Sequence, residues 1–241
     1  MMQPVHRIDA TQANPNKGEV VFRWDKALWN LGMLLAAIIL IPFHTNSSAI
    51  ALFFVLTYFS LLIGHSAGMH RMMIHKSFKA KSWVEKFLIY IGVLVGMSGP
   101  HGVIRIHDLR DWAQRQSACH DFFAHRRSYW QDIWWQLTCD FKFTHPPKIT
   151  IEPEFDTHFY RWLESTWRIH QLGLAFILYF LGDWPFIVWG VFARVAVSVT
   201  GHWTITYFCH NPGPGNWRVK DATVQASNTV SYTHLTLPTI A

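Results

Sequence analysis

The stretch that decides the fold runs from residue 50 to residue 75 and reads IALFFVLTYFSLLIGHSAGMHRMMIH. Its first part, Ile50 to about Gly68, is apolar over nearly the length of about 20 residues that a membrane-crossing helix needs. Its last part places His70 and His75 where such a helix would reach water. Imidazole is a common ligand for iron, copper and zinc. The stretch therefore predicts a membrane span that ends in a metal site.

The spacing of the two histidines sets an expectation for their geometry. Five positions correspond to about 140° around an α-helix. We therefore expect the two rings to face different sides of a metal site near the helix end, without sharing one stripe of the helix surface.

The rest of the chain also has the composition of a membrane protein. Half of the 241 residues are hydrophobic and only 15% are charged, below the usual share of about 25%. Further apolar runs predict three more spans: Leu28–Phe43, Ile169–Leu181 and Trp184–Trp203. Leu28–Phe43 and Ile169–Leu181 are short for a span. We expect an all-α membrane protein with four transmembrane helices and a cytosolic helical cap that carries the histidines.

The distribution of Lys and Arg predicts the orientation of these spans. Four lie before the first span, fourteen between Arg71 and Arg168 and two after Trp203, whereas the short connections carry none. This positive-inside pattern places both termini and the large middle portion in the cytoplasm. It also accounts for the net charge of +6 without nucleic acid as a partner. Arg194 lies inside the fourth run, and we expect an acidic or carbonyl partner for it.

The middle portion contains the remaining candidates for the site. The run Phe87–Gly99 is too short to span and predicts a segment at the membrane surface. A helix is expected from Ser117 to about Phe141. His107 and Asp111 stand at i and i+4, on one helix face. His120 and His125 repeat the five-residue interval, and His202 ends the fourth span at the same membrane face.

The motif HRMMIH, within GHSAGMHRMMIHKSFKA, resembles the first histidine box of the integral-membrane acyl-lipid and acyl-CoA desaturases. That box has the form HxxxxH, and the residues Lys76, Phe78 and Lys79 resemble its basic, aromatic flank. The order of elements is also similar over most of 28–228: two spans, a first box, a surface segment, a second box, two more spans and a lone histidine, here His202.

The second box departs from the family form HxxHH. His107 is kept, but Arg110 and Asp111 stand where two histidines are expected. Carboxylates bind such metals and guanidinium groups do not. Asp111, His120 and His125 are therefore weaker candidate ligands beside His70, His75, His107 and His202. Arg71, Arg126 and Arg127 are candidates to orient a ligand or to meet a lipid head group.

The C-terminal residues Val230–Ala241 form a tail that we interpret as non-native. Back-translated, 230–239 resembles a sequencing-library adapter, and such segments are excluded from fold reasoning. We expect one desaturase-like domain over 1–229, with the third HxxHH box missing because it would follow Asn228. The chain as given is accordingly expected to be inactive.

The resemblance implies a non-haem diiron enzyme that uses O₂ and desaturates a fatty acyl chain. Its implied partners are an acyl-CoA or acyl-lipid substrate, membrane lipid and a ferredoxin-like or cytochrome-like electron donor. The implied location is the inner membrane of a bacterium. Two alternatives stay open: a membrane hydroxylase of fatty acids or hydrocarbons with similar boxes, and a non-catalytic protein that kept the scaffold.

Overall fold

The computed structural model describes residues 7–210 and residue 222, and these form two compact units. One unit takes Met1–Leu28, Ile106–Thr150 and Thr200–Ala241, and the other takes Trp29–Arg105 and Ile151–Val199. We call the first the strand unit and the second the helical unit. Each is built from separate stretches of chain, and the expectation of one domain over 1–229 stays a prediction.

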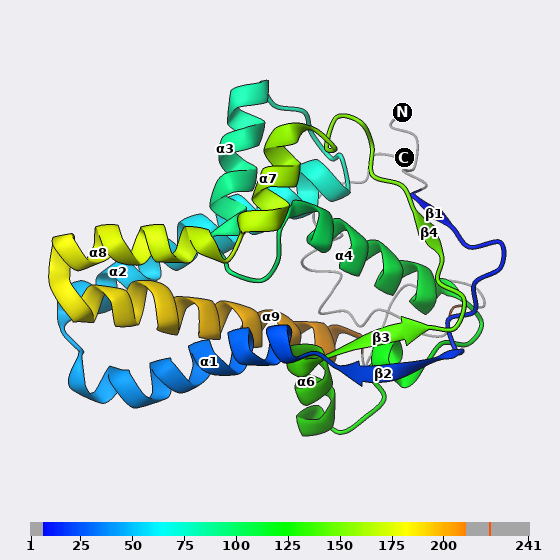
Figure 1. The fold of residues 1–241 in the computed structure, drawn as a ribbon, viewed down its shortest axis with the longest axis horizontal. Helices are drawn as coiled ribbons and strands as arrows, with labels where there is room; N and C mark the ends of the chain where they lie inside the picture. Colours follow the sequence, from blue (N-terminus) through cyan, green and yellow to red (C-terminus); the bar gives the residue numbers. More distant parts are fainter. Residues whose placement is uncertain (1–6, 211–221, 223–241) are drawn as a thin grey trace. The chain divides into compact units, whose positions relative to one another are not determined.

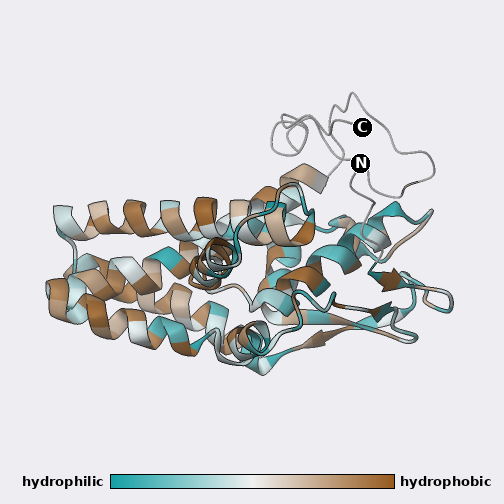
Figure 2. Cartoon of the chain, turned by 90° about the horizontal axis from the view of Figure 1, so that it is seen from above, coloured by the Kyte–Doolittle hydropathy of each residue, from teal (hydrophilic) through white to brown (hydrophobic). Residues whose placement is uncertain are grey.

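The helical unit contains most of the apolar sequence. Its segments, including those that continue into the strand unit, are α1 (Trp24–Leu40), η1 (Ile41–Phe43), α2 (Ser47–Thr57), the π-helix η2 (Tyr58–Ile74), α3 (Ser82–Val93), α4 (Pro100–Arg115), α7 (His158–Thr166), α8 (Ile169–Ile187), the π-helical η3 (Val188–Ala193) and α9 (Arg194–His210) (Figure 1). The start of α2 is set by Asn46, whose side chain accepts a hydrogen bond from the Ala49 amide at 2.8 Å. The long helices are largely apolar along their length (Figure 2).

Within the described part of the chain, three helical stretches are long and apolar enough to cross a membrane. They are Trp24–Phe43, Ser47–Ile74 and Ile169–Cys209. The first two contain the predicted spans and extend beyond them. The third covers both remaining runs, which are joined at a kink where Gly182 and Asp183 have non-helical φ and ψ angles. Gly190, after the break, lies against Leu178, before it, so the stretch doubles back on itself (Figure 1).

Close backbone contact joins η2 to α3. A Cβ placed on Gly64 would lie 2.3 Å from the Gly92 nitrogen, and one on Gly68 would lie 2.8 Å from the Leu88 Cβ. Small residues allow this approach between apolar helices. Met69, Met73, Ile89 and Val93 then form a buried core between the two helices. The predicted surface segment is therefore a helix that packs on the one carrying HRMMIH.

This contact predicts a steep effect of one methyl group. The Gly64→Ala variant is expected to lose about 1–3 kcal/mol of unfolding free energy, because the new Cβ meets backbone that cannot move aside. Gly173→Ala is the matched control, since its Cβ would have no neighbour within 4 Å. Equilibrium unfolding in detergent micelles measures both, and equal stability of the two variants would contradict the close contact.

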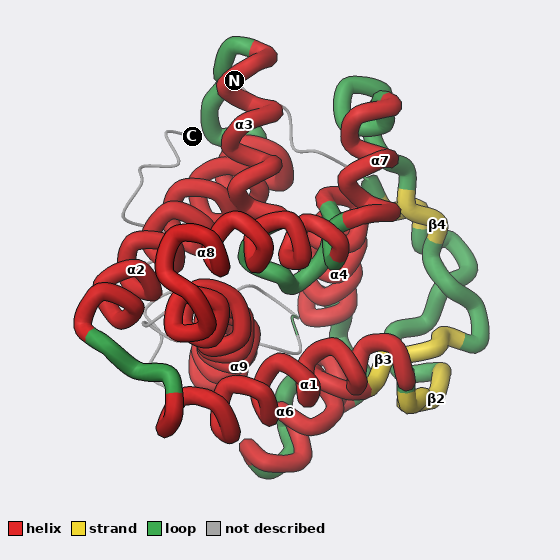
Figure 3. The backbone as a smooth tube through the Cα atoms, turned by 60° about the vertical axis from the view of Figure 1, so that its left-hand side comes forward, coloured by secondary structure: helices red, strands yellow, loops and turns green. Residues whose placement is uncertain are grey.

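The described chain is mostly helical, as expected, but the strand unit also contains short strands that were not expected. β1 (Ile8–Asp9) pairs antiparallel with β4 (Lys148–Ile149), and β2 (Gly18–Phe22) pairs antiparallel with β3 (Cys139–Phe143) (Figure 3). The strands were missed because each is short and its partner lies more than a hundred residues away. Their register puts Phe22 opposite Cys139.

The expected single helix from Ser117 to Phe141 is also wrong. The chain forms α5 (Asp121–Ala124) and α6 (Tyr129–Thr138) and then enters β3. His125 separates the helices because its backbone is left-handed, with φ of 51°, a conformation that ends a helix.

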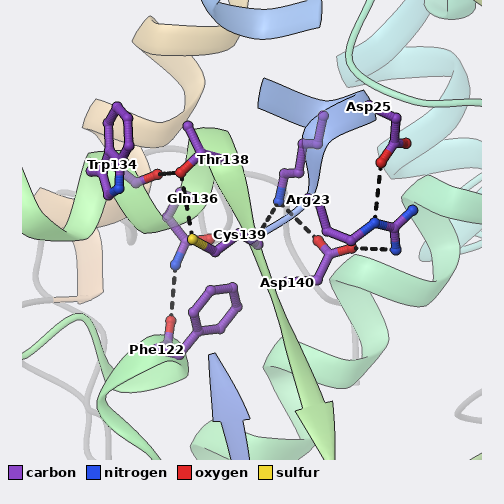
Figure 4. Close-up of polar contacts among 9 residues, drawn as sticks. Arg23, Asp25, Phe122, Trp134, Gln136, Thr138, Cys139 and Asp140 are labelled. Carbon is purple, nitrogen blue, oxygen red and sulfur yellow. Dashed lines mark hydrogen bonds and ion pairs between the residues drawn. The ribbon is translucent and has the colours of Figure 1, made fainter. Parts of the chain in front are cut away.

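Side chains near the start of β3 hold this region together (Figure 4). The Gln136 amide donates to the Phe122 carbonyl at 2.9 Å, which joins α6 to α5. Arg23 and Lys26 both contact the Asp140 carboxylate, at 3.1 and 3.0 Å. The entry to α1 is thereby tied to β3.

Candidate metal centre

The first histidine box lies at the end of η2, and its backbone explains its geometry. The His75 amide donates to the His70 carbonyl at 3.0 Å, a hydrogen bond that closes one π-helical turn over five residues. The rings consequently converge, and their Nε2 atoms are 3.1 Å apart. We expected the two rings to face different sides of the site without sharing one stripe of the helix surface. That expectation was wrong, because it assumed α-helical geometry.

The separation of the two nitrogens suits one metal ion. Two imidazoles that bind an ion at about 2.1 Å and at a right angle have nitrogens about 3.0 Å apart. His70 is half-buried and His75 is exposed, so the pair is open to water. Nitrogen ligands of this type fit iron, and a hydrogen bond between the rings has the same length.

The residue after the box is held in an uncommon conformation. Lys76 has a φ of 49°, which non-glycine residues seldom adopt. Its ammonium group forms ion pairs with Glu152 at 3.0 Å and Glu154 at 2.7 Å. These carboxylates raise the pKa of Lys76 above its ordinary value, against the opposing effect of desolvation. The two ion pairs fix the point where the chain leaves His75.

Helix α4 carries the second box, and its first turn is anchored within the helical unit. The Glu164 carboxylate accepts from the His101 and Gly102 amides at 2.9 and 3.1 Å. A carboxylate at this end satisfies free amides and complements the helix dipole. Ile104 is fully buried in the core that contains Met69 and Met73. His107 follows Ile104 by three residues, on the same face of the helix.

Carboxylates surround His107, which is itself buried. Its Nδ1 lies 3.1 Å from Asp108 Oδ1 and 3.9 Å from Asp111 Oδ2. Asp111 also lies 3.9 Å from the Arg110 Nε and 3.8 Å from Arg115 Nη2. The two residues that replace histidines thus lie beside each other, with Asp111 among cationic groups.

His120 has a structural task at the start of α5. Its Nδ1 accepts a hydrogen bond from the Phe122 amide at 3.1 Å, and its ring lies against Phe141 and Trp135. A neutral imidazole that accepts at Nδ1 carries its proton on Nε2, so neither nitrogen offers a free lone pair to a metal. Burial lowers the pKa of His120 from its ordinary value.

This cap predicts a pH dependence of stability. Because the pKa of His120 is lower in the folded state, the unfolded chain binds a proton more readily below about pH 6.5. The contribution of the cap to the free energy of unfolding, about 1 kcal/mol, is complete above that pH and is lost as the pH falls. In His120→Asn the cap acceptor does not titrate, so unfolding curves from about pH 7.5 to about pH 5 should show a shallower decline. An unchanged slope would contradict the role of His120.

His125 forms a buried pair with Asp132. The Nδ1 atom lies 2.9 Å from Asp132 Oδ2 and 3.1 Å from Oδ1, and both side chains are 1% exposed. A carboxylate on one ring nitrogen is also how metal-binding histidines are oriented. His125 therefore has the arrangement of a ligand, although a buried structural pair has the same one.

The other predicted residues lie on separate elements. His202 is half-buried on α9, with its ring beside Trp203. Arg71 is half-buried one residue after His70. Arg126 is exposed, and Arg127 pairs with Asp121 at 2.9 Å.

Sequence reasoning missed two groups near the second box. Asp108 directly follows His107, and its position beside a histidine was the available signal. Arg7 Nη1 lies 3.1 Å from Asp108 Oδ2. No signal in the sequence indicated this contact, because 101 positions separate the two residues.

Arg194 has the carbonyl partners that its sequence position predicted. It is fully buried, donates from Nε to the Gly190 carbonyl at 2.6 Å and from Nη2 to Gln171 Oε1 at 2.7 Å, and contacts the Leu94 carbonyl. This cation joins segments of the helical unit and does not belong to the histidine site.

Comparison with known proteins finds sequence relatives that are desaturases. No protein-family model matches the chain. It is 28% identical over 209 residues to the sn-1 stearoyl-lipid 9-desaturase of Anabaena variabilis, covering 85% of this chain and 74% of that protein. It is 28% identical over 213 residues to the sn-2 palmitoyl-lipid 9-desaturase of Nostoc sp. (strain 36), covering 86% and 72%. A plant relative, the icosanoyl-CoA 5-desaturase of Limnanthes douglasii, is 27% identical over 194 residues, covering 75% and 51%.

These relatives are desaturases, and desaturases are oxidoreductases. The predicted resemblance to acyl-lipid and acyl-CoA desaturases is confirmed. Three helical stretches in the described residues are long and apolar enough to cross a membrane, as expected of a membrane protein. The chain is therefore similar to these fatty acid desaturases over 75% to 86% of its length.

Proposed function

We propose that this protein is a non-haem diiron enzyme that uses O₂ to desaturate a fatty acyl chain, carried by a lipid or by coenzyme A, at the membrane. The observation that carries the proposal is the convergence of His70 and His75 at the end of a helix that is long and apolar enough to cross a membrane, with Nε2 atoms 3.1 Å apart. The named substrates of the relatives, acyl-lipids and acyl-CoA, support the substrate class.

The proposed ligands are His70, His75, His107 and His202, with Asp111 and His125 as weaker candidates. The Nδ1 contact of His107 with Asp108 supports its inclusion, because it leaves Nε2 directed away from the carboxylate. We leave His120 out, since its Nδ1 caps α5.

Iron with O₂ would supply the oxidising power that an unactivated acyl CH₂ requires, because such a carbon has no acidic proton for a general base. The protein's own residues bind and orient. The apolar spans sheath the acyl chain and exclude water from it. The half-buried Arg71 and the exposed Arg126 are suited to an anionic head group or to an acidic donor protein.

The proposed topology has four spans, with the break at Gly182 and Asp183 forming the turn between the last two. Both termini and the histidine boxes face the cytoplasm, as the distribution of Lys and Arg favours. The electron donor is a ferredoxin-like or cytochrome-like protein on that side, and the membrane is the inner membrane of a bacterium.

Product analysis tests the proposal. The gene is expressed in a host rich in saturated acyl chains, and the fatty acid methyl esters of the host are separated by gas chromatography and mass spectrometry. New monounsaturated chains are expected, and their absence from a His70→Ala/His75→Ala control ties them to the site. Hydroxylated chains would instead identify the hydroxylase alternative.

Metal analysis tests the same proposal without turnover. The purified protein is expected to retain iron, measured by plasma mass spectrometry, and the double histidine variant is expected to lose it. A wild-type protein with only trace iron and no new product would support a non-catalytic member of the family and overturn the proposal.

A further inference from the structure

Asp108 bridges two side chains from distant parts of the sequence. We propose that Arg7 and Asp108 are positioning residues for His107, which hold its ring so that Nε2 is presented to a metal ion. This inference rests on the proposed function, because it takes His107 as a ligand.

The two carboxylate oxygens of Asp108 have separate partners. Oδ1 lies 3.1 Å from His107 Nδ1, and Oδ2 lies 3.1 Å from Arg7 Nη1. When Nδ1–H donates to the carboxylate, the lone pair of the imidazole is on Nε2. Asp111 is too far from Nδ1 for a hydrogen bond, at 3.9 Å. Asp108 is therefore the carboxylate that orients the ring.

Burial restrains the contacts that Asp108 makes with Arg7 and His107. The side chains of Arg7, His107 and Asp108 are 3%, 9% and 15% exposed. An ion pair with so little exposure is screened much less by water and salt than a surface pair. Contact with the guanidinium also restrains Asp108, which immediately follows His107 on the helix and could otherwise adopt another rotamer.

The backbone of Arg7 is itself held in place. Its carbonyl accepts from the Thr150 amide at 2.9 Å, and the next residue, Ile8, pairs with Ile149 in the β1–β4 ladder. The guanidinium thus belongs to the residue directly before a paired strand. The N-terminal segment then acts on the second box through one carboxylate.

A purely structural role for Arg7 would have a different signature. An ion pair that only ties the N-terminal segment to α4 would change the unfolding of the protein when broken, but not the metal affinity of the folded protein. The two roles are separated by measuring metal binding and unfolding on the same variants.

The experiment uses the full chain, purified in detergent without metal and titrated with Co²⁺. Visible absorption reports the coordination of Co²⁺, and competition with a chelator gives its affinity. Asp108→Ala is expected to weaken Co²⁺ binding about 10- to 100-fold and to change the spectrum, the range typical for partners of metal ligands. Arg7→Met should weaken it less, and Arg7→Lys should recover part of the loss.

The double variant Arg7→Met/Asp108→Ala should bind Co²⁺ no more weakly than Asp108→Ala alone, because Arg7 acts through Asp108. Arg23→Met is the matched control, since it breaks another Arg–Asp contact of 3.1 Å in the same unit, at a half-exposed site. It should leave Co²⁺ binding unchanged. Asp108→Asn keeps the shape of the side chain and covers the case in which Asp108→Ala does not fold.

If folded Arg7→Met and Asp108→Asn bind Co²⁺ with the affinity and absorption spectrum of the wild type, the positioning role is overturned. The proposed metal centre is not affected by that result. A wild-type chain that binds no Co²⁺, or a His107→Ala variant that binds it as tightly as the wild type, would overturn the assignment of His107 as a ligand, and the positioning role with it.

Discussion

His75→Ala is expected to weaken metal binding by about a hundredfold or more and to abolish the desaturated product. Zinc sites with four protein ligands bind with about 10–16 kcal/mol, so one ligand contributes about 3 kcal/mol, or two orders of magnitude. The structure supplies the reason for this site: His75 Nε2 lies 3.1 Å from its partner on His70, so either ring alone leaves an incomplete pair.

The measurement is a chelator competition with Fe²⁺ or Co²⁺ on detergent-purified protein, together with the fatty acid profile of expressing cells. His158→Ala is the control, because His158 is an exposed histidine at the start of α7. His75→Ala should keep the unfolding midpoint of the metal-free wild type, since His75 is exposed. Undiminished affinity in this variant would show that the two rings share only a hydrogen bond.

Arg194→Met is expected to lower the unfolding free energy by about 3–5 kcal/mol, the largest stability effect that we predict. Methionine fills much of the volume but donates no hydrogen bond. The Gln171 amide oxygen, the Leu94 carbonyl and Ser60 Oγ, which lies 3.3 Å from Nη1, would each lose a donor in an apolar interior. Buried acceptors without a partner cost about 1–3 kcal/mol each.

Reversible unfolding of the purified protein in mixed micelles measures this loss. Arg194→Lys should recover part of it, because an ammonium keeps the charge but cannot reach acceptors on several segments at once. Arg161→Met removes an exposed arginine whose nearest carboxylate oxygen, on Asp156, is 3.7 Å away. Arg161→Met should lower the free energy of unfolding by less than about 1 kcal/mol. A loss no larger than this for Arg194→Met would refute the bridging role of Arg194.

Much of the fold follows from local patterns. The three long apolar stretches contain every span predicted from hydropathy, and the carbonyl partners of Arg194 follow from the cost of a cation among apolar helices. HRMMIH indicated the resemblance to desaturases because its residue types and their spacing can be read from the sequence without any knowledge of packing. The predicted ligands His107 and His202 depend on the same motif order and stay predictions.

Other features depend on hydrogen bonds and on neighbours that no local pattern reports. The helix expected between Ser117 and Phe141 ends where His125 turns left-handed and where β3 finds β2. His120 resembled a ligand until its ring proved to cap α5. Glycines at 64 and 92 gave no sign of contacting each other, because only the packing of η2 on α3 brings their backbones together.

The sequence by itself determined the resemblance to desaturases and the histidine pair at the end of a long apolar stretch, since apolar length and residue spacing are properties of the chain alone. Only the tertiary structure decided that His70 and His75 converge, and that Asp108 and Arg7 contact the second box. The π-helical turn that aligns the two rings depends on the backbone hydrogen bond from the His75 amide to the His70 carbonyl, in a helix that packs closely on α3. Contact between Arg7 and Asp108 needs a strand pairing across most of the chain, which no local stretch encodes.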